Sequence, residues 1–303
     1  MKDFSSWGIK TRKFPEYNYN GVWHNLLTWR TGSGQALELP PEKSEFYDVG
    51  LGTKCNATCP FCYVSATKDG IFYEDICETW NKWMDITPLN DRPFQIAIGS
   101  SNEPTIHPEF LEFIKTVYES GVVPNYTTNG ITLSKLFLSS ELKEILEAQK
   151  LLEYTEKYCG GVAVSCNKHL EEEWIAAVRA LMSIDVHINL HYIISDKKSV
   201  DEFIKIYDEF SKDVLYFVLL PLMPAGRSKK GVEQGTWEYL ESKIENREKI
   251  AFGAHFVDYL KDSKIRTWLY PPESFSKNVI LTKDKVQITP SSFNMNPIKI
   301  IKL

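Results

Sequence analysis

Short apolar runs, bounded by glycine and polar residues, recur along the chain from about residue 46. Between them, apolar residues return every three or four positions, which is the period of an amphipathic helix. Strands that alternate with helices in this way predict βα units and a parallel sheet. The pattern predicts strands at Phe46–Gly52, Phe94–Gly99, Asn125–Asn129, Val162–Asn167, His187–Ser195 and Val214–Leu222.

The segments between these strands each place apolar residues on one helical face, which we expect to pack against the sheet. The expected faces are Ile76, Trp80, Trp83 and Met84; Phe110, Ile114, Val117 and Tyr118; Leu138, Leu142, Ile145 and Leu146; Leu170, Trp174, Val178 and Leu181; and Val200, Phe203, Ile204 and Tyr207.

Most of the strands carry small or polar residues on one of their two faces, because successive side chains point to opposite sides of a sheet. Parallel strands buried on both faces usually read as continuous apolar runs. An open or partial barrel with a polar interior fits this alternation better than a closed barrel packed with Val, Ile and Leu. A half-solvated sheet is the alternative. The expected polar face is Asp48, Gly50, Gly52, Gln95, Ala97, Gly99, Asn125, Thr127, Asn129, Ser165, Asn167, His187, Asn189 and His191.

Composition indicates an ordinary globular protein. The 303 residues are 43% hydrophobic and 25% charged, and the formal net charge of −5 argues against a nucleic-acid partner. The first residues contain no apolar signal segment, and the longest apolar stretch, Tyr216 to Met223, is too short to span a bilayer. We therefore expect a cytoplasmic protein without a membrane partner.

Three cysteines with the spacing C-x3-C-x2-C, Cys55, Cys59 and Cys62, are the most informative chemical feature. Cysteine thiolates are the usual ligands of iron–sulfur clusters, and three of them can hold three irons of a four-iron cluster. The fourth iron is then open to a small molecule. The cysteines outside this run are Cys77, Cys159 and Cys166.

Other uses of the three cysteines stay open. A reducing compartment disfavours disulfides. A zinc site needs four nitrogen or sulfur ligands, and none of the six histidines lies near this run in sequence. A distant histidine could still complete such a site, and chance clustering of structural cysteines is the third alternative.

The cysteine run resembles the defining motif of the radical S-adenosylmethionine (radical SAM) superfamily, including the aromatic Phe61 before the third cysteine. The resemblance implies a (βα)6 partial TIM-type barrel and one [4Fe–4S] cluster on Cys55, Cys59 and Cys62. It also implies that SAM chelates the open iron, with Phe61 and Tyr63 near its adenine.

The loop after the second strand, Gly99-Ser100-Ser101-Asn102-Glu103, resembles the family's Gly-Gly-Glu-Pro motif, which binds the methionine amino group of SAM. Its doubled glycine is replaced here, which leaves room for a SAM-binding fold that has lost turnover.

Two later strand ends complete the resemblance, because ligands in such sheets bind at the carboxyl ends of the strands. Thr128, Asn129, Ser165 and Asn167 stand where the family contacts the rest of SAM. His191 is expected on the same interior side, where it contacts adenine or substrate or is a core histidine. Cys166, between two interior positions, is expected to be a structural core residue.

Both ends of the chain lie outside the predicted barrel of residues 46–222. Residues 1–45 are rich in aromatic residues, which either line the substrate opening or cover the barrel. In residues 223–303 we expect Arg227 to meet an anionic substrate group or to lie in a solvated loop, a helix at Thr236–Lys261, and a hairpin of Val279–Leu281 with Val286–Thr289. This tail resembles a SPASM or twitch extension without its cysteines.

The resemblance implies an oxygen-sensitive enzyme that receives an electron from flavodoxin or ferredoxin and cleaves SAM to a 5′-deoxyadenosyl radical. The radical abstracts hydrogen from a substrate, for which we expect a peptide or protein before other small molecules. The sequence identifies no further catalytic side chain. A nucleotide- or tRNA-modifying enzyme is one alternative, and a zinc- or cluster-binding protein without catalysis is another.

Overall fold

The computed structural model describes residues 17–19, 22–24, 46–88, 92–93, 95–245, 247–253, 256, 276–292 and 296–303. Two short strands precede the main sheet and pair antiparallel, β1 (Tyr17–Tyr19) and β2 (Val22–His24). The expectations for the other residues of the N-terminal extension lie outside the described residues.

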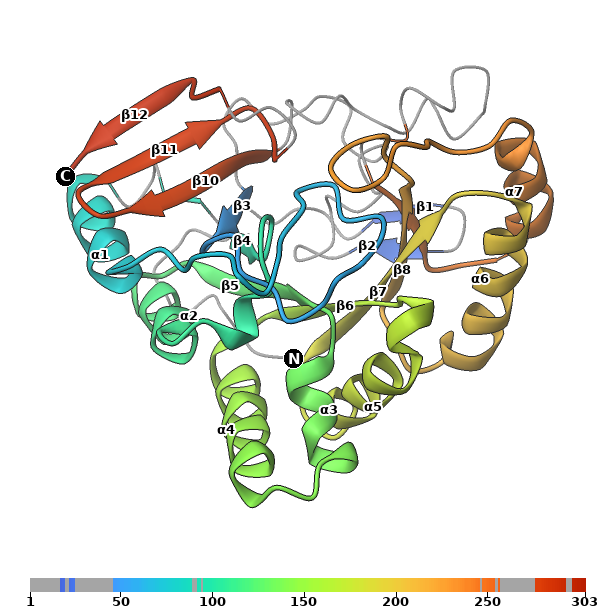
Figure 1. Cartoon of the computed structure of the whole chain (residues 1–303), viewed down its shortest axis with the longest axis horizontal. Helices are drawn as coiled ribbons and strands as arrows, with labels where there is room; N and C mark the ends of the chain where they lie inside the picture. Colours follow the sequence, from blue (N-terminus) through green and yellow to red (C-terminus); the bar gives the residue numbers. More distant parts are fainter. Residues whose placement is uncertain are drawn as a thin grey trace.

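Six parallel strands follow one another across the main sheet in chain order, with a helix or helices after each of the first five. This arrangement is the predicted βα partial barrel, and its strands curve around a common interior in Figure 1. The strands are β3 (Phe46–Gly50), β4 (Gln95–Ile98), β5 (Val123–Thr128), β6 (Gly161–Ser165), β7 (His187–Ile194) and β8 (Tyr216–Pro221).

The helices lie on the outer side of this arc (Figure 1) and bury their apolar faces against it. Trp80 and Trp174 are among the largest fully or nearly fully buried side chains of this layer. Burying a large apolar side chain stabilises the fold by roughly 1.5–3 kcal/mol, so this layer holds the strands in place. The helices are α1 (Ile76–Ile86), α2 (Phe110–Glu119), α3 (Ile131–Leu138), α4 (Leu142–Tyr158), α5 (Glu171–Leu181), α6 (Lys197–Phe210) and α7 (Thr236–Ile244), with short 3-10 turns η4 (Pro104–Ile106) and η5 (Lys168–Leu170).

The apolar face predicted across residues 138–146 is wrong. Helix α3 ends at Leu138 and α4 begins at Leu142, and the side chains of Leu138, Leu142 and Leu146 are 51%, 69% and 53% exposed. Ser139 causes the break, because its hydroxyl accepts from the Glu141 backbone and donates to a carboxylate, an alternative to helical bonding. The face of α4 that is buried is Ala148, Leu151, Thr155 and Tyr158.

The C-terminal segment extends the sheet at both edges. The predicted hairpin is confirmed as β10 (Ser276–Thr282) with β11 (Lys285–Thr289), and β10 pairs parallel with β3. Strand β12 (Lys299–Lys302) adds to β11, as the red strands of Figure 1 show. The sheet thus continues past the boundary predicted at residue 222.

The helix predicted to continue to Lys261 instead ends at Ile244. The backbone of Lys249 has φ 58°, which a helix does not allow, and Ile250–Phe252 form β9 beside β8. This strand covers an edge of β8 that would otherwise present unpaired backbone groups. Among the described residues, no helix combines the length and the apolar character needed to cross a bilayer.

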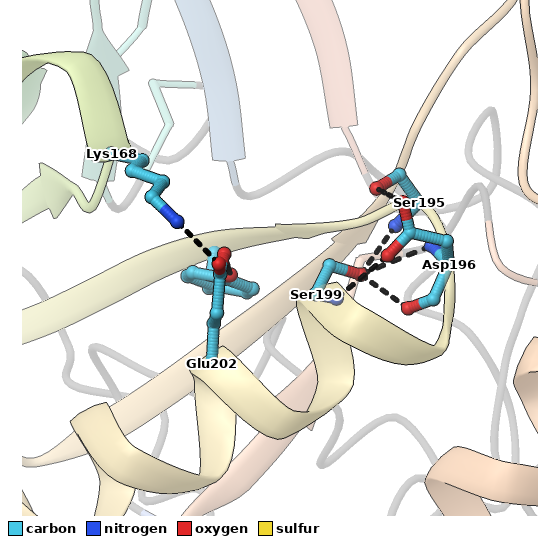
Figure 2. A network of polar contacts seen from close by, with 6 residues as sticks. Lys168, Ser195, Asp196, Ser199 and Glu202 are labelled. Atoms are coloured by element: carbon cyan, nitrogen blue, oxygen red, sulfur yellow. Dashed lines mark hydrogen bonds and ion pairs between the residues drawn. The ribbon is translucent and has the colours of Figure 1, made fainter.

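Helix α6 begins with a capping box that fixes the turn after β7. Asp196 Oδ1 accepts from the Ser199 backbone N–H at 2.7 Å, and Ser199 Oγ accepts from the Asp196 N–H at 3.1 Å. Figure 2 shows this pair beside Lys168, whose ammonium reaches Glu202 on the next turn of α6. The two contacts join α6 to the ends of β7 and η5.

Replacing Asp196 with alanine is expected to lower the free energy of unfolding by about 1 kcal/mol, because the first turn of α6 loses its acceptor. Urea denaturation of the metal-free protein measures the change. The exposed Asp213, replaced in the same way, is the control. A cost for Asp196→Ala no larger than that of Asp213→Ala would contradict the capping role.

Candidate active site

A cavity of about 410 Å³ lies inside the barrel, with the three cysteines of the motif in its lining. The cavity confirms the prediction of an open barrel with a polar interior, because most residues of the predicted polar strand face line it. Cys166 instead packs in the core, as the strand alternation predicts. The predicted cofactor residues in the lining are Phe61, Tyr63, Gly99, Ser100, Asn102, Glu103, Thr128, Asn129, Ser165, Asn167 and His191.

Ser101 is the predicted cofactor residue that is absent from the lining. Its hydroxyl donates to the Gly52 carbonyl at 2.8 Å. Its Oγ would lie only 2.2 Å from a Cβ on Gly50, so the glycine leaves room for Ser101 against the backbone of β3. Ser101 therefore joins two loops of the site and does not face the cavity.

The cysteines stand on the long loop between β3 and α1, light blue in Figure 1. The loop is held by backbone hydrogen bonds such as Cys55 N to Thr67 O at 2.8 Å. All three thiols are half-buried. Side-chain amides from two strand ends approach them, with Asn129 Nδ2 3.8 Å from Cys55 Sγ and Asn167 Nδ2 3.8 Å from Cys59 Sγ. Sequence elements far apart thus converge on the sulfurs.

The chemistry of this donor set fits an iron–sulfur cluster. Burial raises the pKa of the Cys59 thiol to about 11, and the negative charges of Cys55 and Cys62 add to the rise. Three thiolates in the lining of one cavity repel one another, and iron cations would compensate that repulsion. Hydrogen bonds to the sulfurs from Asn129 and Asn167 are of the kind that tunes such clusters. Within the described residues, no three His, Cys, Asp or Glu side chains are placed to share a single metal ion, whereas a four-iron cluster binds each thiolate to a different iron.

Glu103 is the buried hub of the site, with 3% of its surface exposed. Its carboxylate accepts from the Thr128 hydroxyl at 2.8 Å, the Asn129 backbone at 2.8 Å and the Thr105 hydroxyl at 2.7 Å. Burial raises the pKa of this carboxyl, and the hydrogen bonds oppose the rise. Glu103 therefore ties the end of β4 to the end of β5. Thr128, 1% exposed, uses its hydroxyl in the same network.

The C-terminal hairpin contributes to the site in a way the sequence did not reveal. Tyr63 Oη donates its hydrogen to the Ser100 carbonyl at 2.8 Å and is hydrogen-bonded to Ser292 Oγ at 3.2 Å. Ser100 Oγ donates in turn to Asn278 Oδ1 at 2.8 Å. Asn278 and Ser292 carry no recognisable motif. The pairing of β10 with β3 places Asn278, and Ser292 comes from the segment that follows β11.

Arg227 holds the cysteine loop from the opposite side of the barrel. Its Nε donates to the Cys59 carbonyl and its Nη1 to the Ala66 carbonyl, each at 2.7 Å, and its backbone N–H donates to the Cys62 carbonyl at 3.0 Å. Gly226 makes this approach possible, because its φ is 62° and a Cβ there would lie 2.3 Å from the Cys62 oxygen. We expected Arg227 to meet a substrate anion or to lie in a solvated loop, and its guanidinium instead donates to carbonyls of the irregular cysteine loop.

Replacing Arg227 with alanine is expected to speed the loss of iron from the reconstituted protein to a chelator at least tenfold. The reason is the loss of two charge-assisted hydrogen bonds, each contributing about 1.5–3 kcal/mol. Arg227→Lys should rescue only partly, because one ammonium lacks the guanidinium's fork of donors. Arg179→Ala, on the exposed face of α5, is the control. Equal iron release from Arg227→Ala and Arg179→Ala would contradict this role.

Comparison of the sequence with known proteins gives limited information. No family model matches it. A curated 7,8-dihydro-6-hydroxymethylpterin dimethyltransferase of Methanocaldococcus jannaschii is 29% identical over 98 residues, which are 32% of this chain and 19% of that protein. The chain therefore spans only a small part of this relative.

Comparison of the structure is more informative. SuiB of Streptococcus suis, in a structure bound to its precursor peptide SuiA, is similar with a TM-score of 0.60 and 15% identity, covering 84% of this chain and 61% of SuiB. The enzyme anSMEcpe, with bound AdoMet and the Cp18Cys peptide, gives 0.54 and 15%, covering 83% and 75%. The chain therefore has the partial-barrel fold of radical SAM enzymes.

Proposed function

We propose that this protein is a radical SAM enzyme with one [4Fe–4S] cluster on Cys55, Cys59 and Cys62. The observation that carries the proposal is the convergence of these three thiols on one cavity of the barrel. The fold supports it, because SuiB has also been solved bound to S-adenosylmethionine. The cluster with SAM would supply a 5′-deoxyadenosyl radical, and the chain would position both it and the substrate.

The residues around the thiols have separate roles in this proposal. Asn129 and Asn167 hold the sulfurs through their amides. Gly99, Ser100 and Asn102 offer backbone and side-chain groups to the methionine end of SAM. Glu103 fixes their loop through its hydrogen bonds to Thr128 and Asn129. Phe61 packs edge to face on His169, with 5.8 Å between the ring centroids, beside the expected adenine position.

The remaining contacts to SAM complete the assignment. Tyr63, Ser165 and His191 line the same cavity and are proposed to contact its adenosine part. Thr128 and Ser101 act through their hydrogen bonds to Glu103 and Gly52 and position the site. The electron is proposed to come from flavodoxin or ferredoxin.

A peptide or protein is the proposed substrate. SuiB and anSMEcpe, whose folds this chain shares, were both solved with peptides bound. The alternative is a nucleotide or a tRNA as the substrate. The pterin dimethyltransferase, similar over 98 residues, is named for a heterocyclic substrate, which supports an alternative to a peptide.

Anaerobic reconstitution followed by metal analysis tests the cluster. About four irons and four sulfides per chain are expected. Zinc without sulfide would contradict the proposal and favour the zinc-binding alternative. Binding of peptide pools, compared with nucleotides and RNA on the reconstituted protein, then separates the two substrate classes.

A further inference from the structure

A row of interior positions runs across the five neighbouring strands β3 to β7. The cysteines lie beyond the carboxyl end of β3, and the row lies within the strands. Each residue is the register partner of the next: Asp48, Ala97, Asn125, Gly161 and His187. All five line the cavity. We call them the lower row. Polar side chains alternate with Ala and Gly, so the polar groups stand with open space between them.

The amide of Asn125 has a fixed orientation. Its Nδ2 donates to Gln95 Oε1 and to the Ile96 carbonyl, both at 3.1 Å. Both amide hydrogens are therefore used, and Oδ1 must point the other way. That oxygen is buried and has no hydrogen-bond partner. An unsatisfied buried acceptor costs about 1–3 kcal/mol, so native proteins usually provide a water or a ligand for it.

Gly161 keeps this oxygen accessible. Its φ is not positive, so the backbone conformation does not require glycine there. A Cβ at this position would lie 3.4 Å from Asn125 Oδ1 and 3.3 Å from the His187 carbonyl. Any side chain at residue 161 would thus cover the acceptor. Because Gly161 has no side chain, the space in front of Asn125 Oδ1 stays open to the cavity.

A second acceptor lies two strands away. Asn189 Oδ1 is also buried without a hydrogen-bond partner, and Asn189 lines the cavity one inward-facing step further along β7. On β6, the strand between the two asparagines, the residues level with them are Gly161 and Ala163, and Val162 and Ser165 also line the cavity. At the level of the two oxygens β6 therefore carries no side chain larger than a methyl group.

The charges around this space favour a cation. The carboxylate of Asp48 belongs to the lower row, and the described lining contains no Lys or Arg. Glu103, the other acidic residue of the lining, accepts hydrogen bonds from Thr128 and Asn129. A negative charge in the lining of a cavity attracts a cationic ligand more than it does in bulk water.

We propose that the lower row with Asn189 is a substrate subsite for a primary ammonium group, which donates N–H hydrogen bonds to Asn125 Oδ1 and Asn189 Oδ1. This assignment rests on the proposed function, because it places the substrate deeper in the barrel than SAM. It involves none of the residues assigned to the cluster or to SAM.

The test uses the reconstituted protein saturated with SAM and the probe n-butylammonium, followed by ligand-observed NMR. Butyramide and butyrate, which are isosteric with each other and have the same chain length in carbons as n-butylammonium, are titrated in parallel. We expect n-butylammonium to bind most tightly and butyrate to bind at least tenfold more weakly. Equal binding of the three probes, or n-butylammonium binding that is weaker with saturating SAM than without SAM, would overturn the proposal.

Two variants locate the binding. Gly161→Ala covers Asn125 Oδ1, and Asn189→Leu removes the second acceptor at nearly constant volume. Each is expected to weaken n-butylammonium binding at least fivefold, with folding checked by thermal melting. Asn81→Leu, on the exposed side of α1, is the control and should bind like the wild type. Unchanged binding in Gly161→Ala and Asn189→Leu would overturn the proposal even if both fold.

Two further measurements separate this proposal from the proposed function. Iron content and SAM binding report on the cluster site, and the amine titration is repeated on protein without SAM. Nα-acetyl-lysine amide, used as a second probe, distinguishes a peptide-borne ammonium from a free amine. Tighter binding of the lysine derivative than of n-butylammonium supports a peptide source, and the reverse order supports a small-molecule amine.

Discussion

Cys59→Ala is expected to abolish 5′-deoxyadenosine formation and to leave the reconstituted protein without a stable four-iron cluster. The three thiols of the loop are half-buried, line one cavity and influence one another electrostatically. Two remaining thiolates cannot hold three irons, so the cluster has one ligand too few. Iron and sulfide analysis measures the first effect, and chromatography of SAM reaction products measures the second.

Cys77→Ala is the matched control for this experiment. Cys77 is also a half-buried cysteine, but it lies on α1 outside the cavity lining and packs against the core. Its iron content should equal that of the wild type. Equal loss of iron from Cys59→Ala and Cys77→Ala would contradict the assignment, since the effect would then be one of general destabilisation.

Glu103→Ala is expected to have the largest effect on stability, lowering the free energy of unfolding by roughly 3 kcal/mol or more. The substitution removes the acceptor of the Thr128 hydroxyl, the Thr105 hydroxyl and the Asn129 N–H in a buried place. Each stranded donor costs about 1–3 kcal/mol. Urea denaturation of the metal-free, reduced protein gives the value.

The exposed Glu209 on α6 provides the comparison, because Glu209→Ala should change stability by no more than about 0.5 kcal/mol. Glu103→Gln should be less destabilising than Glu103→Ala, since its amide oxygen still accepts from some of the same donors. A cost for Glu103→Ala below about 1 kcal/mol would show that these hydrogen bonds contribute little.

The partial barrel and its polar interior could be predicted because both depend on local periodicity. The alternation of Asp48 and Gly50 with Val49 placed one face of β3 inside, and the cavity lining confirms this for Asp48. The cysteine spacing likewise is a local pattern. Its loop follows the first parallel strand of the sheet, and a strand followed by a ligand loop is what the fold requires.

The remaining features depend on contacts between distant parts of the chain. Arg227 binds carbonyls of a loop some 160 residues earlier, and its sequence neighbours show only a glycine-rich basic loop. Ser292 lies in the segment after β11 and contacts Tyr63 because β11 pairs with β10 and β10 pairs with β3. The break at Ser139 was missed for a different reason, since a hydroxyl bonding its own backbone overrides an apolar period.

The hydrogen-bond partners of Glu103 also could not be assigned from the sequence. The sequence places it at a strand end beside Pro104, where a carboxylate could meet an ammonium. Its actual partners, Thr105, Thr128 and Asn129, were each visible as polar residues near strand ends. Only the three-dimensional arrangement shows that these three residues satisfy the Glu103 carboxylate. The side-chain amides of Asn129 and Asn167 are then left to contact the cysteine sulfurs.

The most direct test of the central claim is reductive cleavage of SAM by the anaerobically reconstituted protein. With dithionite and SAM, with and without a peptide pool, the wild type is expected to produce 5′-deoxyadenosine, and Cys59→Ala is expected to produce none above background. No 5′-deoxyadenosine from wild-type protein that carries about four irons per chain, under any of these conditions, would contradict the assignment as a radical SAM enzyme.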